Sequence, residues 1–297
     1  MAAFSDLGGF ILGMSMLDRF VNILFLGNFS SKVKEINIQG ITLVINPEKL
    51  LELVLRYAVK AEGGEVYRRY RRFRADRWYG GIATADVVGC NLRCGMCWAW
   101  RNTSYLLDVG EWLPPGEVAE RLRDIAKRRG FQQVRISGGE PLVAPTHLLK
   151  VMDLLSGYVF IVETNGTLID RQIAKELAAR PNAVVRISLK GATAEEFEKI
   201  TGSPGAYFYR QLNALRLLVE SGMKPCHDVH PAAMLGFSTD ENIKRLEKAL
   251  AEIDPDLPQC IDVEYVILYP HVVRLMKTRG LTPIRAVRPD GVPAFMI

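Results

Sequence analysis

Tyr158-Val159-Phe160-Ile161-Val162-Glu163-Thr164-Asn165-Gly166 joins an unbroken apolar run to a short polar loop, and this unit decides the fold. An apolar run without polar alternation is typical of a strand that is covered on both faces, as in parallel sheets. Asn165-Gly166 is a turn signal, so we expect the strand to end just before it. Parallel α/β proteins bind ligands at the carboxyl ends of their strands, which makes this loop a candidate site.

Five further apolar runs repeat the pattern, with amphipathic segments between them. We expect strands at 82–88, 131–137, 158–163, 183–189, 224–234 and 261–268, and helices at 115–129, 145–156, 169–180, 207–221 and 239–253. This alternation predicts parallel βαβ units with right-handed crossovers. Six strands are too few to close a barrel of eight. The predicted fold class is therefore α/β, an open partial (β/α)6 TIM-like barrel with an N-terminal α/β appendage.

The chain divides into three predicted parts. Residues 1–76 form the appendage, with a strand at 36–45 and a helix at 48–61 that ends at two glycines. The barrel covers 77–270, and 271–297 form a C-terminal tail.

Composition fits a globular protein, because 48% of the residues are hydrophobic and 24% are charged. The net charge of +5 permits an acidic partner without requiring one. Residues 7–17 and 21–31 are uncharged, but Asp18 and Arg19 interrupt them, and a membrane span needs about 20 apolar residues. We expect this segment to pack on the barrel or on a partner subunit rather than on a membrane surface. No basic stretch typical of a secretory signal precedes it, so we expect a cytoplasmic protein.

Three of the five cysteines lie in Cys90-Asn91-Leu92-Arg93-Cys94-Gly95-Met96-Cys97. This clustering favours metal ligation in a reducing compartment over a disulfide framework. Thiolates select zinc or iron–sulfur centres, but structural zinc takes four ligands and no second cysteine pair follows. The ferredoxin pattern uses four cysteines with another spacing. Three thiolates on a four-iron cluster leave one iron free for another ligand.

The spacing C-x₃-C-x-Φ-C, with Met96 at the Φ position, resembles the signature of the radical SAM superfamily. In that family S-adenosylmethionine (SAM) chelates the free iron, and an electron from the cluster cleaves it to a deoxyadenosyl radical that abstracts hydrogen from a substrate. The resemblance implies a 4Fe–4S cluster at Cys90, Cys94 and Cys97, with SAM as cofactor. It also implies a reductant such as ferredoxin or flavodoxin.

A second motif follows the second strand, where the family has its GGEP segment. Ser137-Gly138-Gly139-Glu140-Pro141 stands there, and glycines let the backbone approach a ligand closely. The resemblance implies that Gly138 and Gly139 face SAM and that Glu140 holds its methionyl amino group.

The loops after the third and fourth strands resemble those of pyruvate formate-lyase activating enzymes, which read D-T-N-G and D-L-K. Here they read Glu163-Thr164-Asn165-Gly166 and Ser188-Leu189-Lys190. The resemblance places Asn165, Ser188 and Lys190 at SAM, with Ser188 near the ribose and Lys190 near the carboxylate. Because Ser188 replaces an acid that helps to bind a monovalent cation, the cation site is in question.

The fifth strand carries Cys226, Asp228 and His230, which share one face at a period of two. These three are candidate catalytic residues in a substrate pocket, where they could transfer hydrogen atoms or protons. The alternative is a hydrogen-bonded histidine and an inert buried cysteine.

The segment 67–74 alternates aromatic residues with arginines. Tyr67, Tyr70 and Phe73 are spaced as on one face of a helix, which predicts an amphipathic helix with arginines in water. The alternative is a contact with phosphate or nucleic acid.

The sequence thus predicts a radical SAM enzyme. Its substrate is a partner protein that receives a glycyl radical, or alternatively a small molecule, a peptide or RNA. A hypothesis of another class is a non-catalytic metal-binding module that interacts with RNA.

Overall fold

The computed structural model describes residues 44–100 and 108–293, and its compact unit begins at Val44. The predicted strand 36–45 and the uncharged segments before it lie outside the described residues, apart from Val44 and Ile45. None of the helices in the described ranges is long and apolar enough to span a bilayer.

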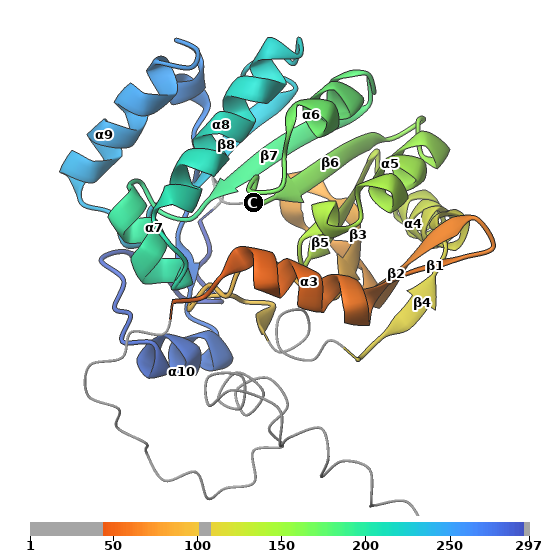
Figure 1. Ribbon diagram of the computed structural model, residues 1–297, viewed down its shortest axis with the longest axis horizontal. Helices are drawn as coiled ribbons and strands as arrows, with labels where there is room; N and C mark the ends of the chain where they lie inside the picture. The colour runs from red at the N-terminus through yellow and green to blue at the C-terminus, as the bar shows by residue number, and fades with distance from the viewer. Residues whose placement is uncertain (1–43, 101–107, 294–297) are drawn as a thin grey trace, which may run out of the picture. The chain divides into compact units, whose positions relative to one another are not determined.

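Six consecutive parallel strands form the barrel, as predicted, and the sheet ends at the sixth without closing. Helices connect the strands and lie along one face of the sheet (Figure 1). The fold is therefore an open partial (β/α)6 barrel. In sheet order the strands are β3 (Ile82–Val87), β5 (Gln133–Gly138), β6 (Val159–Thr164), β7 (Ala183–Leu189), β8 (Val229–Met234) and β9 (Asp262–Glu264). The helices are α4 (Pro115–Arg129), α5 (Pro145–Leu154), α6 (Arg171–Ala178), α7 (Ala194–Thr201), α8 (Ala206–Glu220) and α9 (Asp240–Ala251).

The two faces of the barrel strands differ in polarity. Phe160 and Val162 of β6 belong to the main apolar core, which also includes Leu122 of α4 and Leu148 of α5. The alternate residues point to the inner face, because side chains alternate along a strand. Glu163 lies on this inner face together with charged residues of the neighbouring strands, so the inner face is polar.

The appendage begins with α3 (Pro47–Ala58), whose first turn is capped by Asn46, since Asn46 Oδ1 accepts a hydrogen bond from Lys49 N at 3.0 Å. The prediction of a helix was confirmed, but the helix ends at Ala58 and not at the glycine pair. The chain continues as β1 (Val59–Glu62), and the two glycines make the turn into β2 (Glu65–Asp76).

The prediction of a helix at 67–74 was wrong, because these residues lie in β2, which pairs antiparallel with β3 and also with β4 (Glu111–Leu113). A register shift between Tyr70 and Arg72 places Tyr70 and Phe73 on the same side of the strand, where their rings stack. The spacing of three between Tyr70 and Phe73 therefore comes from a bulge, not from a helical turn. Arg68 is buried, and Arg72 forms an ion pair with Asp86, so this is not a solvated stripe.

Pairing of β2 with β3 joins the predicted appendage to the barrel, and residues 44–76 belong to the same compact unit as the strands that follow. The last predicted strand, 261–268, divides into β9 and β10 (Val266–Ile267), and β10 pairs with β11 (Ala286–Val287) in a small second sheet. Between them lies α10 (Pro270–Thr278), in the region predicted as a tail.

Candidate active site

The loop after β5 is locked onto the loop that carries the cysteines. Gly139 N donates to Val87 O at 3.0 Å, and Glu140 N donates to Gly89 O at 2.9 Å. A Cβ at Gly139 would lie only 2.2 Å from Gly89 O, so only glycine allows this approach. The second glycine of the GGEP segment is thus needed for contact between two protein loops.

The carboxylate of Glu140 joins the loop after β5 to the loop after β6. Its Oε1 accepts from Leu142 N at 3.0 Å and from Thr164 Oγ1 at 2.7 Å, and its Oε2 accepts from Asn165 N at 2.8 Å. The side chain is buried, and burial raises its pKa although these three donors favour the charged form. A carboxylate has about four acceptor positions, so one on Oε2 is left for a ligand.

Asn165 links the loop after β6 to the cysteine loop. Its Nδ2 donates to Asn91 Oδ1 at 2.8 Å and lies 3.8 Å from Cys90 Sγ, while its Oδ1 accepts from Thr167 N at 3.0 Å. Asn91 Nδ2 donates in turn to Thr167 Oγ1 at 2.8 Å. The side-chain amide of Asn165, in the loop after β6, therefore helps to hold Cys90 in place.

Gln211 of α8 joins the loops after β6 and β7, and the sequence analysis missed it. It is fully buried; its Nε2 donates to Asn165 O at 2.5 Å and to Ser188 O at 3.0 Å, and its Oε1 accepts from Lys190 N at 3.0 Å. A glutamine on the otherwise apolar core face of this helix was the available signal. The side chain of Lys190 folds back and donates to Ser188 Oγ.

Glu196 of α7 joins the loop after β7 to the loop after β8. Its Oε2 accepts from Ala192 N at 2.7 Å and from Ser238 Oγ at 2.5 Å, and Oε1 accepts from Asn242 Nδ2 at 2.7 Å. The loops after β3, β5, β6, β7 and β8 are thus bonded each to the next. The sequence predicted that the first four meet at one edge, and the hydrogen bonds show that they do.

The three predicted ligands Cys90, Cys94 and Cys97 lie on this edge, and none of them is in a disulfide. Burial, together with the nearby Glu140 carboxylate, raises the pKa of Cys90 to about 12, and burial raises that of Cys94 to about 11. A soft metal centre would replace these protons, because metals bind thiolates. Within the described ranges, no three His, Cys, Asp or Glu side chains converge as the ligands of a single metal ion would. The ligands of a four-iron cluster bind different irons and stand further apart, so three partly buried cysteines outside any disulfide on one loop fit such a cluster by their chemistry.

Met96 does not extend over the loop. It packs in a second apolar cluster with Ile200, Met234 and Leu281. This packing supports the turn between Cys94 and Cys97, and the contact of Met96 with the cofactor stays a prediction.

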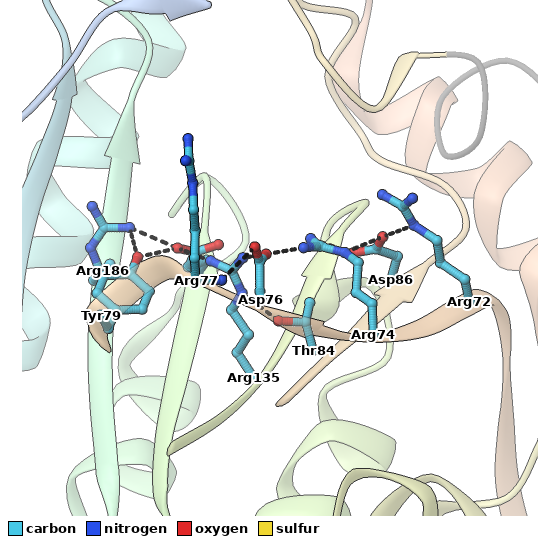
Figure 2. Close-up of polar contacts among 10 residues, drawn as sticks. Arg72, Arg74, Asp76, Arg77, Tyr79, Thr84, Asp86, Arg135 and Arg186 are labelled. Atoms are coloured by element: carbon cyan, nitrogen blue, oxygen red, sulfur yellow. Dashed lines mark hydrogen bonds and ion pairs between the residues drawn. The ribbon is translucent and has the colours of Figure 1, made fainter. Parts of the chain in front are cut away.

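A row of ion pairs crosses the inner face of the barrel (Figure 2). Arg186 of β7 lies between carboxylates: its Nη1 is 2.7 Å from Glu163 Oε1, and its Nη2 pairs with Asp262. Arg135 of β5 continues the row, with Nη1 2.9 Å from Glu163 Oε1 and Nη2 2.7 Å from Asp76 Oδ2. Arg74, Asp86 and Arg72 complete it on β2 and β3.

Glu163 is the centre of this row. Burial alone would raise its pKa, but Arg135 and Arg186 outweigh burial and hold the pKa at about 2. Tyr79 donates a hydrogen bond to the same carboxylate, and the pKa of Tyr79 is raised by burial and by the Glu163 charge. Two guanidinium groups already neutralise Glu163, which does not suit it to bind a monovalent cation.

Glu264, at the carboxyl end of β9, differs from the other inner carboxylates. Its single ion pair is a distant one, 3.6 Å from Arg186 Nη2, and within the described ranges its carboxyl group forms no hydrogen bond. Burial raises its pKa. Glu264 is therefore available to a ligand at the mouth of the barrel.

The predicted group of Cys226, Asp228 and His230 does not share a strand face, because β8 begins only at Val229. Cys226 forms a disulfide with Cys260 in the loop before β9, which the sequence analysis did not expect. His230 lies at the amino end of β8, the opposite edge from the cysteine loop. The period-two reasoning failed because Cys226 has a positive φ of 62° and lies in a turn.

The fold and the thiol loop define an α/β barrel protein with a soft-metal site at the carboxyl edge of its strands. Residues 85–250 match the Radical SAM superfamily, and this match covers more than half of the chain. The chain therefore belongs to the radical SAM superfamily. Members of this family use a 4Fe–4S cluster and SAM, so the predicted enzyme class and cofactors are confirmed at the level of the family.

Curated relatives share only part of their length with this chain. A "Probable GTP 3',8-cyclase" of Thermococcus kodakarensis is 35% identical over 118 residues, which are 39% of this chain and 36% of that protein. An "AdoMet-dependent heme synthase" of Methanosarcina barkeri is 31% identical over 146 residues, 46% of this chain and 38% of that protein. The chain thus spans less than half the length of either relative.

Solved structures are similar at lower identity. TYW1 with a lysine-pyruvate adduct has 18% identity and a TM-score of 0.48, and the match covers 80% of this chain and 90% of that chain. SuiB of Streptococcus suis bound to S-adenosylmethionine has 20% identity and a TM-score of 0.44, with 70% and 46% covered. These similarities do not show the special closeness to pyruvate formate-lyase activating enzymes that the loop motifs predicted.

Proposed function

We propose that this chain is a radical SAM enzyme in which Cys90, Cys94 and Cys97 hold a 4Fe–4S cluster. One observation carries the proposal: three cysteines outside any disulfide lie on a loop that is hydrogen-bonded, through Glu140 and Asn165, to the two loops expected at SAM. When bound, the cluster supplies the electron that cleaves SAM to methionine and a deoxyadenosyl radical. A module that only binds metal would not need this set of joined loops.

The residues around the thiols divide the binding of SAM between them. Gly138 has a φ of 87° and lets the backbone approach the cofactor. Lys190 supplies positive charge for the SAM carboxylate, and the Ser188 hydroxyl beside it is placed for a ribose hydroxyl. Glu140 keeps one acceptor position for the amino group, while Asn165 fixes the loop next to Cys90.

The inner face supports a small polar substrate. Arg186, with Glu163 and Asp262, offers donors and acceptors below the cysteine loop, and Glu264 is available to hydrogen-bond a ligand. The relatives named as a GTP cyclase and a heme synthase also act, by their names, on small molecules. The resemblance to activating enzymes, which suggested a partner that receives a glycyl radical, is weakened at Glu163. The corresponding acid of those enzymes helps to bind a cation, whereas Glu163 is neutralised by Arg135 and Arg186.

The test is an anaerobic assay of SAM cleavage. The protein is reconstituted with iron and sulfide, reduced with dithionite and given SAM, and we expect deoxyadenosine and methionine. Cys94→Ala should abolish both products. Absence of products from the wild type, or their formation by Cys94→Ala, would contradict the proposal.

The substrate class is tested in the same assay with a cell extract separated by dialysis. We expect the dialysable fraction to stimulate formation of deoxyadenosine, and GTP is the first pure compound to try. Stimulation by the retained protein fraction alone would instead support a partner protein that receives a glycyl radical.

A further inference from the structure

Cationic side chains surround the cysteine loop. Arg93 is buried, and its Nη1 donates to Cys90 O at 2.6 Å and to Leu92 O at 3.0 Å. Its guanidinium is folded against the loop and interacts electrostatically with all three thiols. Lys190 approaches from the loop after β7 and interacts with Cys94.

Arg279, the first residue after α10, reaches the same loop from the C-terminal part of the chain. Its Nη2 donates to Arg93 O at 3.0 Å and to Thr201 O at 3.3 Å. A Cβ at Gly95 would lie 3.2 Å from Arg279 Cβ and 3.3 Å from Arg279 Cγ. The side chain therefore bonds the residue before Cys94 and leaves little room for a side chain on the residue after it.

Arg279 has no carboxylate partner among the residues that the structure describes. Within the described ranges it forms no ion pair, and its hydrogen bonds go to two backbone carbonyls. The thiol of Cys94 is the acidic group with which it interacts. A guanidinium that contacts this loop without a carboxylate is placed to compensate negative charge on the loop itself.

We propose that Arg279 compensates the negative charge of the cysteine-bound cluster and thereby raises its reduction potential. The inference rests on the proposed function, which places the cluster at these cysteines. Reduction adds one negative charge, and a nearby positive charge stabilises the reduced form. Arg279 lies outside residues 85–250, so the family match does not include it. It is a positioning and charge-compensating residue.

The test measures the potential directly. Wild type, Arg279→Gln and Arg279→Lys are reconstituted anaerobically, their iron is quantified, and the cluster is titrated against applied potential with detection by electron paramagnetic resonance. At a fixed potential we expect the ratio of reduced to oxidised cluster in Arg279→Gln to be about threefold to tenfold lower than in the wild type. A tenfold change in this ratio corresponds to about 59 mV for a one-electron couple. Arg279→Lys keeps the charge and should stay close to wild type.

Arg274→Gln is the matched control, because Arg274 is an exposed cation on α10 and makes no ion pair within the described ranges. It removes the same charge and should leave the potential unchanged. An unchanged potential in Arg279→Gln, or an equal shift in Arg274→Gln, would overturn the inference. If Arg279→Gln does not retain iron, rescue by Arg279→Lys supports charge compensation, and loss of iron in both refutes it. A wild type that binds no cluster would instead refute the proposed function.

Discussion

Replacing Glu140 by alanine tests whether this residue joins the loops or serves only the cofactor. The substitution removes the acceptor for three donors, Leu142 N, Thr164 Oγ1 and Asn165 N. Two of these are buried backbone N–H groups, and each costs about 1 to 3 kcal/mol when left without an acceptor. Relief of the buried charge offsets part of this cost. We therefore expect the free energy of unfolding to fall by about 2 to 4 kcal/mol.

The measurement is urea unfolding of the apoprotein under anaerobic conditions, with iron content and SAM binding measured on the reconstituted protein. Because the Glu140 carboxylate holds Asn165, whose Nδ2 donates to Asn91 next to Cys90, we also expect Glu140→Ala to bind less iron. Glu117→Ala is the control, since Glu117 forms an exposed pair with Arg121 that is worth well under about 1 kcal/mol. Unchanged stability and iron content with loss of SAM binding would show that Glu140 serves the cofactor alone.

Three further changes test other parts of the structure. Glu163 has a pKa of about 2 in place of 4.5, so it stabilises the fold above about pH 4.5 and loses this effect as the pH falls toward 2. Glu163→Gln should therefore lower the free energy of unfolding by about 3 kcal/mol near pH 6 and by much less near pH 3, as measured by urea unfolding. Equal losses at both pH values would contradict the stabilisation of Glu163 by its ion pairs. Gln211→Leu removes three hydrogen bonds that join the loops after β6 and β7. We expect SAM binding, measured by equilibrium dialysis, to weaken about tenfold while the iron content stays constant. Unchanged binding would mean that the loops keep their positions without Gln211. The Cys226–Cys260 disulfide joins residues 34 positions apart and should contribute about 3 to 4 kcal/mol to the free energy of unfolding. Cys226→Ser should therefore lower the urea midpoint of the oxidised apoprotein. A midpoint equal to that of the wild type would show that the two thiols are not paired.

The barrel could be predicted from sequence because its signals are local. The strand at 183–189 and the helix at 115–129 have the bounds that the apolar pattern predicted, since buried parallel strands and amphipathic helices carry their pattern within a few residues. The loops that carry chemistry follow the strands directly, so Cys90 and Glu140 could be assigned to one edge. The strand β2 was missed because a bulge changes the period of its aromatics.

The inner face could not be predicted, because its contacts join distant residues. Arg186 and Tyr79 are separated by 107 positions, and Arg135 and Asp76 by 59. A single arginine in a strand gives no indication of its partner, and the same pattern fits an exposed strand. The disulfide escaped for a similar reason, since pairing of Cys226 with Cys260 depends on which turns meet at the amino edge.

The joined loops at the carboxyl edge have a consequence for the thermodynamics of cofactor binding. Glu140, Asn165 and Gln211 fix the loops to one another before any ligand arrives, so folding has already removed most of their conformational freedom. Binding to a preorganised surface loses little further entropy. Calorimetry of SAM binding to the cluster-loaded protein should accordingly show a small entropic penalty. The sulfonium group of SAM should be held in one orientation as soon as the cofactor binds.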